Sequence, residues 1–242
     1  VTELELRYPD FPGLNLCYET REGMIKHETD YDQSDAGEYA PELRASVEAQ
    51  IANLADEIAY NAHDLDDGLR SGILSPYKLQ ELSIWCELSE MAGWQPGQPF
   101  TAIMRHEIIR ELIGRSVGDV LLTTDSALTA GHLDTPQKVQ EYDRNIVGYS
   151  PDFGAQVGEL KAYLYENLYR HYRLVRMHEK AERILADLFN AYLKEPAMLP
   201  TEAQARLADK ALHRVIADYL AGMTDRYALD EWQKLFDPYA LA

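Results

Sequence analysis

The stretch Glu48-Ala-Gln-Ile-Ala-Asn-Leu-Ala-Asp-Glu-Ile-Ala-Tyr-Asn-Ala-His-Asp-Leu-Asp-Asp-Gly68 decides the fold of this chain, because it predicts a long helix. Ala, Leu, Glu and Gln are strong helix formers and dominate the stretch, and neither Pro nor a run of β-branched residues interrupts it. Gly68 and Gly72 are suitable places for the helix to end. The rest of the chain extends the same helical pattern.

This helix has two distinct faces when its residues are placed at about 100° per residue. One arc is apolar and predicts a face buried in a core, and it consists of Ile51, Leu54, Ala55, Ile58, Ala62 and Leu65. The second arc is polar and consists of Asp56, Tyr60, His63, Asp64 and Asp67. Carboxylates three or four residues apart repel each other, so the polar arc needs a metal, a basic side chain or solvent counterions nearby. A solvated acidic face and a metal or ligand site both meet that need.

Composition limits the classes of protein to which the chain can belong. Its 242 residues, with 46% hydrophobic content, are enough for one globular domain, or one domain plus a lobe. The net charge of −18 argues against a broad nucleic-acid-binding surface, although a local group of cations could still bind a small phosphorylated substrate. Cys17 and Cys86 show no disulfide or metal spacing, which indicates reduced thiols in a cytoplasmic protein. No long apolar run predicts a membrane span.

Several further helices are predicted on both sides of a short aromatic break. Short helices are expected from Tyr18 to His27 and after the capping pair Thr135-Pro136, and a further helix is expected from Ser75-Pro76 toward Met91. A long amphipathic helix is expected over 100–124, and its apolar residues are Ile103, Ile108, Leu112, Ile113, Val117, Val120 and Leu121. Trp85 and Trp94 are expected to pack together. The six acids of 28–42 indicate a solvated loop without the spacing of an EF-hand.

A second important helix is predicted after Ser150-Pro151, over 157–173, because Val157, Leu160, Leu164 and Leu168 supply a buried stripe. Beside that stripe, aromatic and basic side chains follow one another at helical spacing: Lys161, Tyr165, Tyr169 and Tyr172. Residues 161–183 carry six basic residues against three acids. Such a row is most simply the aromatic edge of a core, and it also suits a sugar and a phosphate.

Two more helical segments complete the chain. One continues from Arg173 to Leu193, and one is expected to begin at Pro200-Thr201 and reach Leu220. Thr224 and Asp225 are placed to cap a final helix that holds Trp232 and Phe236. No strand system large enough for a sheet is visible, so the predicted fold class is all-α.

The pattern Asp56-x3-Tyr60-x3-Asp64 within the opening stretch resembles the last metal-site helix of the deoxyguanosine triphosphate triphosphohydrolases, the dNTP-hydrolysing branch of the HD-domain superfamily. The resemblance recurs at Leu14-Asn-Leu, Glu22-Gly and Lys26-His27, in the segment from Tyr163 to His171, and over 218–228. It implies an HD-domain-like helical architecture. Residues 1–72 would hold the end of the HD core, and residues 73–242 would complete the nucleotide pocket.

The resemblance also implies roles for individual residues. Asp56 would be the final ligand of a His…His-Asp…Asp site for a divalent metal such as Mg or Mn. The nucleotide would be held by Tyr60, Asp64, Lys161, Tyr165, Tyr169 and His171, with Tyr60, Asp64 and Tyr169 at the deoxyribose and Lys161 near the triphosphate. The implied reaction cleaves dGTP, or another dNTP, to the deoxynucleoside and triphosphate. Homo-oligomers are expected.

The chain departs from the family pattern in one respect. The upstream histidine, the His-Asp dipeptide of the metal site and the catalytic histidine beyond it do not appear, and the only adjacent pair, His63-Asp64, matches the sugar-contact position. One carboxylate is too few for a mixed His/carboxylate metal site. We therefore expect the chain to correspond to the C-terminal part of such an enzyme, with its catalytic residues upstream, and to be inactive alone. His27 is interpreted as a surface histidine near a helix end.

Three other interpretations remain open or are set aside. A non-enzymatic helical module for nucleotide binding or oligomerisation would release no triphosphate from dGTP. Another HD-type phosphohydrolase would act on nucleotides other than dNTPs. A di-iron bundle requires paired Glu-x-x-His motifs, and the sequence contains none.

Overall fold

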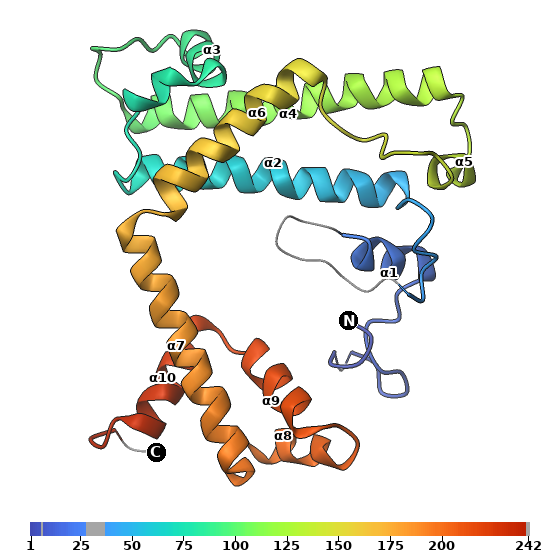
Figure 1. Ribbon diagram of the computed structural model, residues 1–242, viewed down its shortest axis with the longest axis vertical. Helices are drawn as coiled ribbons and strands as arrows, with labels where there is room; N and C mark the ends of the chain where they lie inside the picture. The colour runs from blue at the N-terminus through green and yellow to red at the C-terminus, as the bar shows by residue number, and fades with distance from the viewer. Residues whose placement is uncertain (6, 28–36, 241–242) are drawn as a thin grey trace. The chain divides into compact units, whose positions relative to one another are not determined.

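The computed structural model describes residues 1–5, 7–27 and 37–240, and within them the chain is helical with one isolated bridge between Tyr8 and Phe11 (Figure 1). The all-α class is therefore confirmed. Most of the acidic segment predicted over 28–42 lies outside the described residues. No helix in the described ranges combines the length and apolar character that a membrane span requires.

The chain divides into two compact units, Val1–Leu168 and Tyr169–Ala242. Unit 1 contains α1 (Tyr18–Ile25), α2 (Val47–Arg70), a 3₁₀ turn (Lys78–Glu81), α3 (Ser83–Met91), α4 (Ala102–Gly131), α5 (Pro136–Gln140) and α6 (Pro151–Leu164). Within this unit α2 and α4 lie side by side, and α6 packs on α2 and α3 (Figure 1). The predicted division after residue 72 separates the part that would supply the metal ligand from the part that would complete the nucleotide pocket. It is a functional division and stays a prediction.

Unit 2 is built on α7 (Tyr172–Lys194), against which α9 (Leu212–Ala221) and α10 (Asp225–Phe236) pack. The shorter elements are the 3₁₀ turns Pro196–Met198 and Arg206–Ala208 and the helix α8 (Thr201–Ala205). Its core is apolar and includes Ile184, Leu188, Tyr192, Val215 and Ile216. Thr224 caps α10 by accepting a hydrogen bond from the backbone N–H of Tyr227, as the sequence predicts.

One core cluster of unit 1 joins α2, α4 and α5 to the segment after α5. Ile58 of α2 packs there with Val120, Val139, Ile146 and Val147. The predicted contact between Trp85 and Trp94 is confirmed, with ring centroids 6.3 Å apart and nearly perpendicular planes. The Ser46 and Ser150 side chains cap α2 and α6 by accepting backbone N–H bonds.

Gln50 is buried although it is polar, because its amide satisfies the backbone of the segment that follows α5. Its Oε1 accepts hydrogen bonds from the N–H groups of Ile146, at 2.8 Å, and Val147, at 3.2 Å. Its Nε2 donates to the carbonyl of Ala45 at 2.8 Å. A buried backbone N–H without a partner costs about 1–3 kcal/mol, so Gln50 fixes this segment on α2.

The predicted apolar arc of α2 is wrong at its N-terminal end. Ile51 is 47% exposed and Ala55 is exposed, whereas Ile58, Ala62 and Leu65 are buried. In the first turn of α2, Ala49 and Gln50 are buried instead. Gln50 points into the core because its amide is hydrogen-bonded to backbone groups there. Periodicity alone does not reveal such partners.

The predicted end of α2 also differs from the structure. The helix runs through Gly68 to Arg70, and a Cβ added at Gly68 would lie 2.5 Å from Leu74. Gly68 is therefore required by packing. Gly72, with a φ of +70°, lies just beyond the helix in the left-handed conformation that favours glycine.

Three other predicted helices are interrupted. The helix expected over 157–173 ends at Leu164, passes through a π-helical turn at Tyr165–Tyr169, and is followed by a new helix at Tyr172. The helix expected from Pro200 to Leu220 consists of α8, a 3₁₀ turn and α9. The helix expected from Ser75-Pro76 toward Met91 consists of a 3₁₀ turn and α3. In the first case the predicted row of Lys161, Tyr165, Tyr169 and Tyr172 is not one continuous helical face.

Candidate functional site

The polar arc of α2 lies on the exposed side of the helix. Asp56, Tyr60, His63 and Asp67 are exposed, and Asp64 is half-buried. Asp66 does not belong to this arc. Its carboxylate accepts a hydrogen bond from Arg105 of α4 at 2.7 Å. The arc therefore presents three carboxylates, a histidine and a tyrosine along one side of α2.

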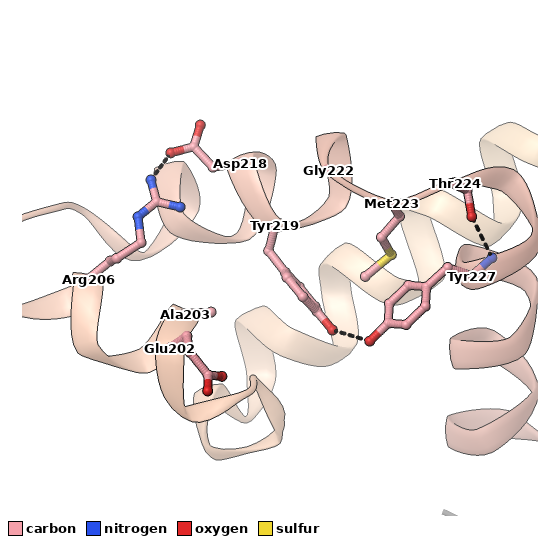
Figure 2. A pocket seen from close by; sticks show the side chains of 9 residues that line it. All are labelled: Glu202, Ala203, Arg206, Asp218, Tyr219, Gly222, Met223, Thr224 and Tyr227. Atoms are coloured by element: carbon pink, nitrogen blue, oxygen red, sulfur yellow. Dashed lines mark hydrogen bonds and ion pairs between the residues drawn. The ribbon is translucent and has the colours of Figure 1, made fainter. Parts of the chain in front are cut away.

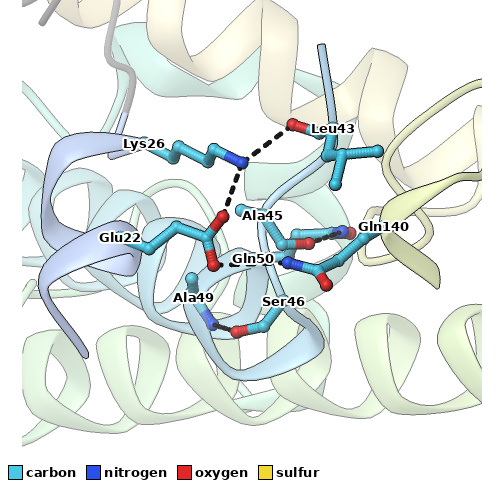
Figure 3. Close-up of polar contacts among 8 residues, drawn as sticks. All are labelled: Glu22, Lys26, Leu43, Ala45, Ser46, Ala49, Gln50 and Gln140. Atoms are coloured by element: carbon cyan, nitrogen blue, oxygen red, sulfur yellow. Dashed lines mark hydrogen bonds and ion pairs between the residues drawn. The ribbon is translucent and has the colours of Figure 1, made fainter. Parts of the chain in front are cut away.

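A buried polar network fixes α1 beside the start of α2 (Figure 3). Glu22 of α1 is only 4% exposed, and its carboxylate pairs with Lys26 at 2.8 Å and accepts a hydrogen bond from Gln140 of α5 at 3.3 Å. Lys26 also donates to the carbonyl of Leu43 at 3.0 Å. A buried carboxylate is stable only when it is paired in this way, so the network determines where α1 ends.

His27 follows Lys26 directly and is therefore placed against α2. Its Nδ1 is hydrogen-bonded to Oδ1 of Asn53, and its Nε2 lies 3.8 Å from Oδ2 of Asp56. The His27 side chain is 34% exposed, and the Asp56 side chain is 65% exposed. The pair His27 and Asn53 is the part of this site that the sequence pattern did not reveal, since their contact joins segments 26 residues apart.

Lys161 reaches the same helix from α6. Its Nζ lies 3.4 Å from Oε2 of Glu57, and both side chains are about one-third exposed. The predicted stripe of Val157, Leu160, Leu164 and Leu168 is buried, and its last member belongs to the π-helical turn that follows α6. Burial raises the pKa of the nearby Tyr149 phenol, and the Glu57 carboxylate adds to that rise. Lys161 thus stands at the acidic side of α2 with one carboxylate already beside it.

The remaining predicted nucleotide contacts fall at and beyond the π-helical turn. Tyr165 belongs to unit 1 and is 49% exposed. Tyr169 and His171 belong to unit 2, where His171 precedes α7 and its Nδ1 accepts a hydrogen bond from the N–H of Arg173 at 3.4 Å. Tyr60 and Asp64 belong to the other unit, so a pocket that joins them to Tyr169 and His171 stays a prediction.

The described side chains do not form a complete metal site. Among residues 1–5, 7–27 and 37–240, no group of three or more His, Cys, Asp or Glu side chains lies close enough to hold a metal ion. Asp56 and His27 together provide at most two donors, and a tight mixed His/carboxylate site requires three or four. The donors among the described residues therefore do not fit the divalent metal that the resemblance implies.

A hollow of about 500 Å³ lies in unit 2 (Figure 2). Its walls come from α8, the following 3₁₀ turn and the region around Gly222, and they include Arg206, Met223 and Tyr227. Arg206 pairs with Asp218, and the hydroxyl groups of Tyr219 and Tyr227 are 3.2 Å apart. The cation in this hollow is compensated inside the protein, so its charge does not indicate a phosphate site.

Comparison with known proteins relates these features to a family. The sequence model described as a phosphohydrolase-associated domain matches residues 147–234. The chain is 41% identical, over 99% of its length, to the deoxyguanosinetriphosphate triphosphohydrolase-like protein of Geobacter metallireducens. It is 42% identical over 95% of its length to such a protein of Deinococcus radiodurans, and 43% identical over 98% to one of Bordetella pertussis.

The chain is a homologue of the deoxyguanosinetriphosphate triphosphohydrolase-like proteins. The resemblance found in the sequence is thereby confirmed. The chain spans 63%, 60% and 62% of the lengths of these three relatives, respectively. The described residues around Asp56 thus hold too few metal donors, in a chain that spans less than two thirds of these relatives.

Proposed function

We propose that a complete enzyme containing this chain cleaves dGTP, or another dNTP, to the deoxynucleoside and intact triphosphate with a divalent metal such as Mg or Mn. The homology supports a triphosphohydrolase-like hydrolase, and the exposed acidic side of α2 is the observation that carries the proposal. Because the described residues hold too few donors for a metal, we propose that this chain alone is inactive.

Asp56 is the residue that we assign to the metal, as one ligand among others that the described residues do not supply. Its side chain is 65% exposed, and it extends from a helix whose opposite side is buried. A rigid helix holds a ligand in a defined position better than a loop does. The remaining ligands would come from outside the described residues.

The nucleotide is assigned to Tyr60, Asp64, Lys161, Tyr165, Tyr169 and His171. Tyr60 and Asp64 lie on the same side of α2 as Asp56, one and two helical turns further on. A tyrosine ring against the sugar leaves little room for a 2′-hydroxyl, and a carboxylate can accept a hydrogen bond from the 3′-hydroxyl. These contacts would select deoxyribose. Lys161 would attract the triphosphate, although Glu57 competes for its charge.

We also predict the oligomeric state and the cellular location of the protein. The family resemblance predicts assembly into homo-oligomers, and the absence of any disulfide or metal spacing at Cys17 and Cys86 predicts a cytoplasmic location. Both cysteines are free and exposed. Gel filtration with light scattering tests the first prediction, and cell fractionation tests the second.

The decisive experiment compares this chain with a full-length homologous polypeptide on dGTP and GTP in the presence of Mn or Mg. Ion chromatography and ³¹P NMR distinguish triphosphate from pyrophosphate and phosphate. We expect the full-length protein to release triphosphate and deoxyguanosine from dGTP, to act poorly on GTP, and to lose activity with a chelator. We expect no release by this chain alone. Release of pyrophosphate or phosphate instead would contradict the proposal.

The second candidate function is a non-enzymatic helical module that binds nucleotides, and the incomplete donor set favours it for this chain taken alone. Isothermal titration of the chain with dGTP in the presence of a chelator tests it. Binding that disappears in Tyr60→Ala, without hydrolysis by the full-length protein, would favour the module over the enzyme.

A further inference from the structure

The hollow of unit 2 has no role in the proposed function. None of the residues assigned to the metal or to the nucleotide lines it, although much of its wall comes from 218–228, one of the stretches that carry the family resemblance (Figure 2). Its volume of about 500 Å³ lies within the usual range for a small-molecule site. The side chains on its wall determine which class of ligand it can accept.

Most of this wall suits a flat, apolar ring. Tyr227 is 43% exposed, Tyr219 is half-buried, and Met223 and the buried Ala203 line the same hollow. A tyrosine ring offers a flat face on which a heteroaromatic ring can stack, and a thioether makes favourable contacts with aromatic rings. Among the described residues, Tyr227 is not one of those that pack into the core of unit 2, so its ring is available to a ligand.

The polar groups of the hollow differ in whether they already have partners. Arg206 lies one helical turn beyond Glu202 but pairs with Asp218 instead. The Glu202 carboxylate is exposed and makes no hydrogen bond or ion pair with any described residue. The hydroxyl groups of Tyr219 and Tyr227 lie 3.2 Å apart, and a hydroxyl oxygen in such a pair can accept a further hydrogen bond. The uncommitted groups are therefore acceptors, which require a ligand with N–H donors.

Guanine is the nucleobase that matches a single unpaired carboxylate. Its N1–H and N2–H groups stand side by side on one edge, so one carboxylate can accept hydrogen bonds from both. Adenine and cytosine place an acceptor nitrogen beside their amino group, and thymine has a carbonyl oxygen on each side of its N–H. With any of these three bases, the second carboxylate oxygen would face an acceptor and lose a hydrogen bond.

A phosphate group does not suit this hollow. The charge of Arg206 is compensated by Asp218, and the unpaired carboxylate of Glu202 repels an anion. The net charge of the whole chain, −18, acts in the same direction. The hollow therefore favours a nucleoside over a nucleotide. Cleavage of dGTP to triphosphate, as proposed above, releases such an uncharged molecule, deoxyguanosine.

We propose that this hollow binds the guanine base of a nucleoside without phosphate, and that its ligand in the complete enzyme is the product deoxyguanosine. The base stacks on Tyr227, and its N1–H and N2–H groups donate to Glu202. The identity of the ligand as a product rests on the proposed function, whereas the binding of the base rests on the hollow alone. The site shares no residue with the nucleotide contacts assigned above.

The first experiment titrates this chain with deoxyguanosine and follows the methionine methyl signals by NMR. The Met223 signal should shift, because the bound base lies in the hollow that Met223 lines, and the signal of Met177, 70% exposed on α7, should not. We expect a dissociation constant on the order of 0.1 mM. The shift should persist in Tyr60→Ala, which removes a contact of the other proposed nucleotide site.

The second experiment tests the carboxylate. Deoxyinosine, which lacks the N2 amino group, should bind about 10-fold more weakly than deoxyguanosine, because one carboxylate oxygen then has no donor. Glu202→Gln should weaken deoxyguanosine about 10-fold and largely remove its advantage over deoxyinosine. Glu182→Gln is the matched control, since Glu182 is exposed on α7 and does not line the hollow, and it should leave both affinities unchanged.

The third experiment tests the stacking ring. Tyr227→Ala should weaken binding of deoxyguanosine about 10-fold, whereas Tyr227→Phe keeps the ring and should stay within about 3-fold of the wild type. Circular dichroism should show an intact fold in both variants, because Tyr227 is partly exposed and lies outside the core of unit 2.

Three results would overturn the proposal. The first is a Met223 signal that does not move at deoxyguanosine concentrations on the order of 1 mM. The second is equal affinity for deoxyguanosine, deoxyinosine and deoxyadenosine, which would leave Glu202 without a role. The third is tighter binding of dGMP than of deoxyguanosine at Met223, which would indicate a phosphate site. The proposed function can fail separately: if the full-length protein releases pyrophosphate or phosphate while this chain binds deoxyguanosine, the base site stands and its role as a product site is refuted.

Discussion

Asp56 in unit 1 and Asp218 in unit 2 are both carboxylates on helices, in stretches that resemble the same family. They differ in how far each side chain is exposed and in which charged groups lie beside it. The Asp218 side chain is 7% exposed and is paired with Arg206 and with Arg214, the latter at 2.8 Å. The Asp56 side chain is 65% exposed and has a histidine nitrogen at 3.8 Å as its neighbour. The protein compensates the charge of Asp218 internally, whereas the charge of Asp56 remains accessible to a cation from outside.

This difference leads to opposite expectations for the two residues. Removing the charge of Asp218 should change the free energy of unfolding. Removing the charge of Asp56 should change catalysis in the complete enzyme and leave the fold intact. Four predictions, from the largest expected effect to the smallest, test this contrast.

The largest effect is expected for Asp56→Asn in the full-length protein. Loss of a metal ligand should lower the rate of triphosphate release by at least about 100-fold, which exceeds the usual effect of a residue that only supports a ligand. The melting temperature measured without metal should not change, because the side chain is exposed. Glu48→Gln, also exposed on α2, is the control and should retain activity. Full activity in Asp56→Asn would leave α2 with a purely structural role.

The second effect concerns stability and is expected for Asp218→Asn. The substitution removes charge-assisted hydrogen bonds from Arg206 and Arg214 to a nearly buried oxygen pair, so the free energy of unfolding should fall by about 1–3 kcal/mol. Urea unfolding of unit 2, followed by tryptophan fluorescence of Trp232, measures it. The exposed Asp209→Asn should change stability by less than about 0.5 kcal/mol.

The third effect links His27 to Asp56. We expect His27→Gln to lower kcat/KM about 10-fold in the full-length protein, because the imidazole, held by Asn53, borders the Asp56 carboxylate. If His27 acts through Asp56, the double variant with Asp56→Asn should be no slower than Asp56→Asn alone. Additive losses would show that His27 acts separately.

The fourth effect is the pH dependence of the Asp218 contribution. Burial by itself would raise the pKa of Asp218, but the hydrogen bond from Arg206 and the positive charges of Arg214 and Arg206 outweigh it, so the pKa is lowered. A lowered pKa means that the stabilisation is complete above the unfolded-state pKa of about 4 and is lost as the pH falls through the folded-state pKa. The stability difference between the wild type and Asp218→Asn should therefore be largest near neutral pH and shrink below about pH 4. A difference that grows in acid would contradict the assignment.

Local signals predicted much of the helical framework correctly. Thr135-Pro136, Ser150-Pro151 and Thr224 each begin a helix, because a side-chain oxygen beside a helix start accepts a backbone N–H wherever the helix lies. Long-range contacts account for the errors. Gln50 is buried because backbone groups about a hundred positions later donate to it, and Ile51 is exposed as a result.

The candidate site shows the same division. Spacing on one helix was enough to put Asp56, Tyr60 and His63 on a single exposed side of α2. The neighbour of Asp56 was not predictable, because His27 reaches it only after the buried pair Glu22 and Lys26 has fixed α1 against α2. The row from Lys161 to Tyr172 was predicted as continuous, and the π-helical turn at Tyr165–Tyr169 divides it.

The sequence by itself determined that this chain is all-α, where most helices begin, and which family it resembles, because helix formation and capping depend on residues within one or two turns. Only the tertiary structure decided which carboxylate is compensated and which is exposed. A carboxylate is compensated only where the packing of the helices places a basic side chain beside it, as Lys26 is placed beside Glu22 and Arg206 beside Asp218. Burial makes an unpaired charge too costly to keep, so Glu22 and Asp218 are paired with basic side chains, whereas Asp56 stays exposed and has only His27 nearby.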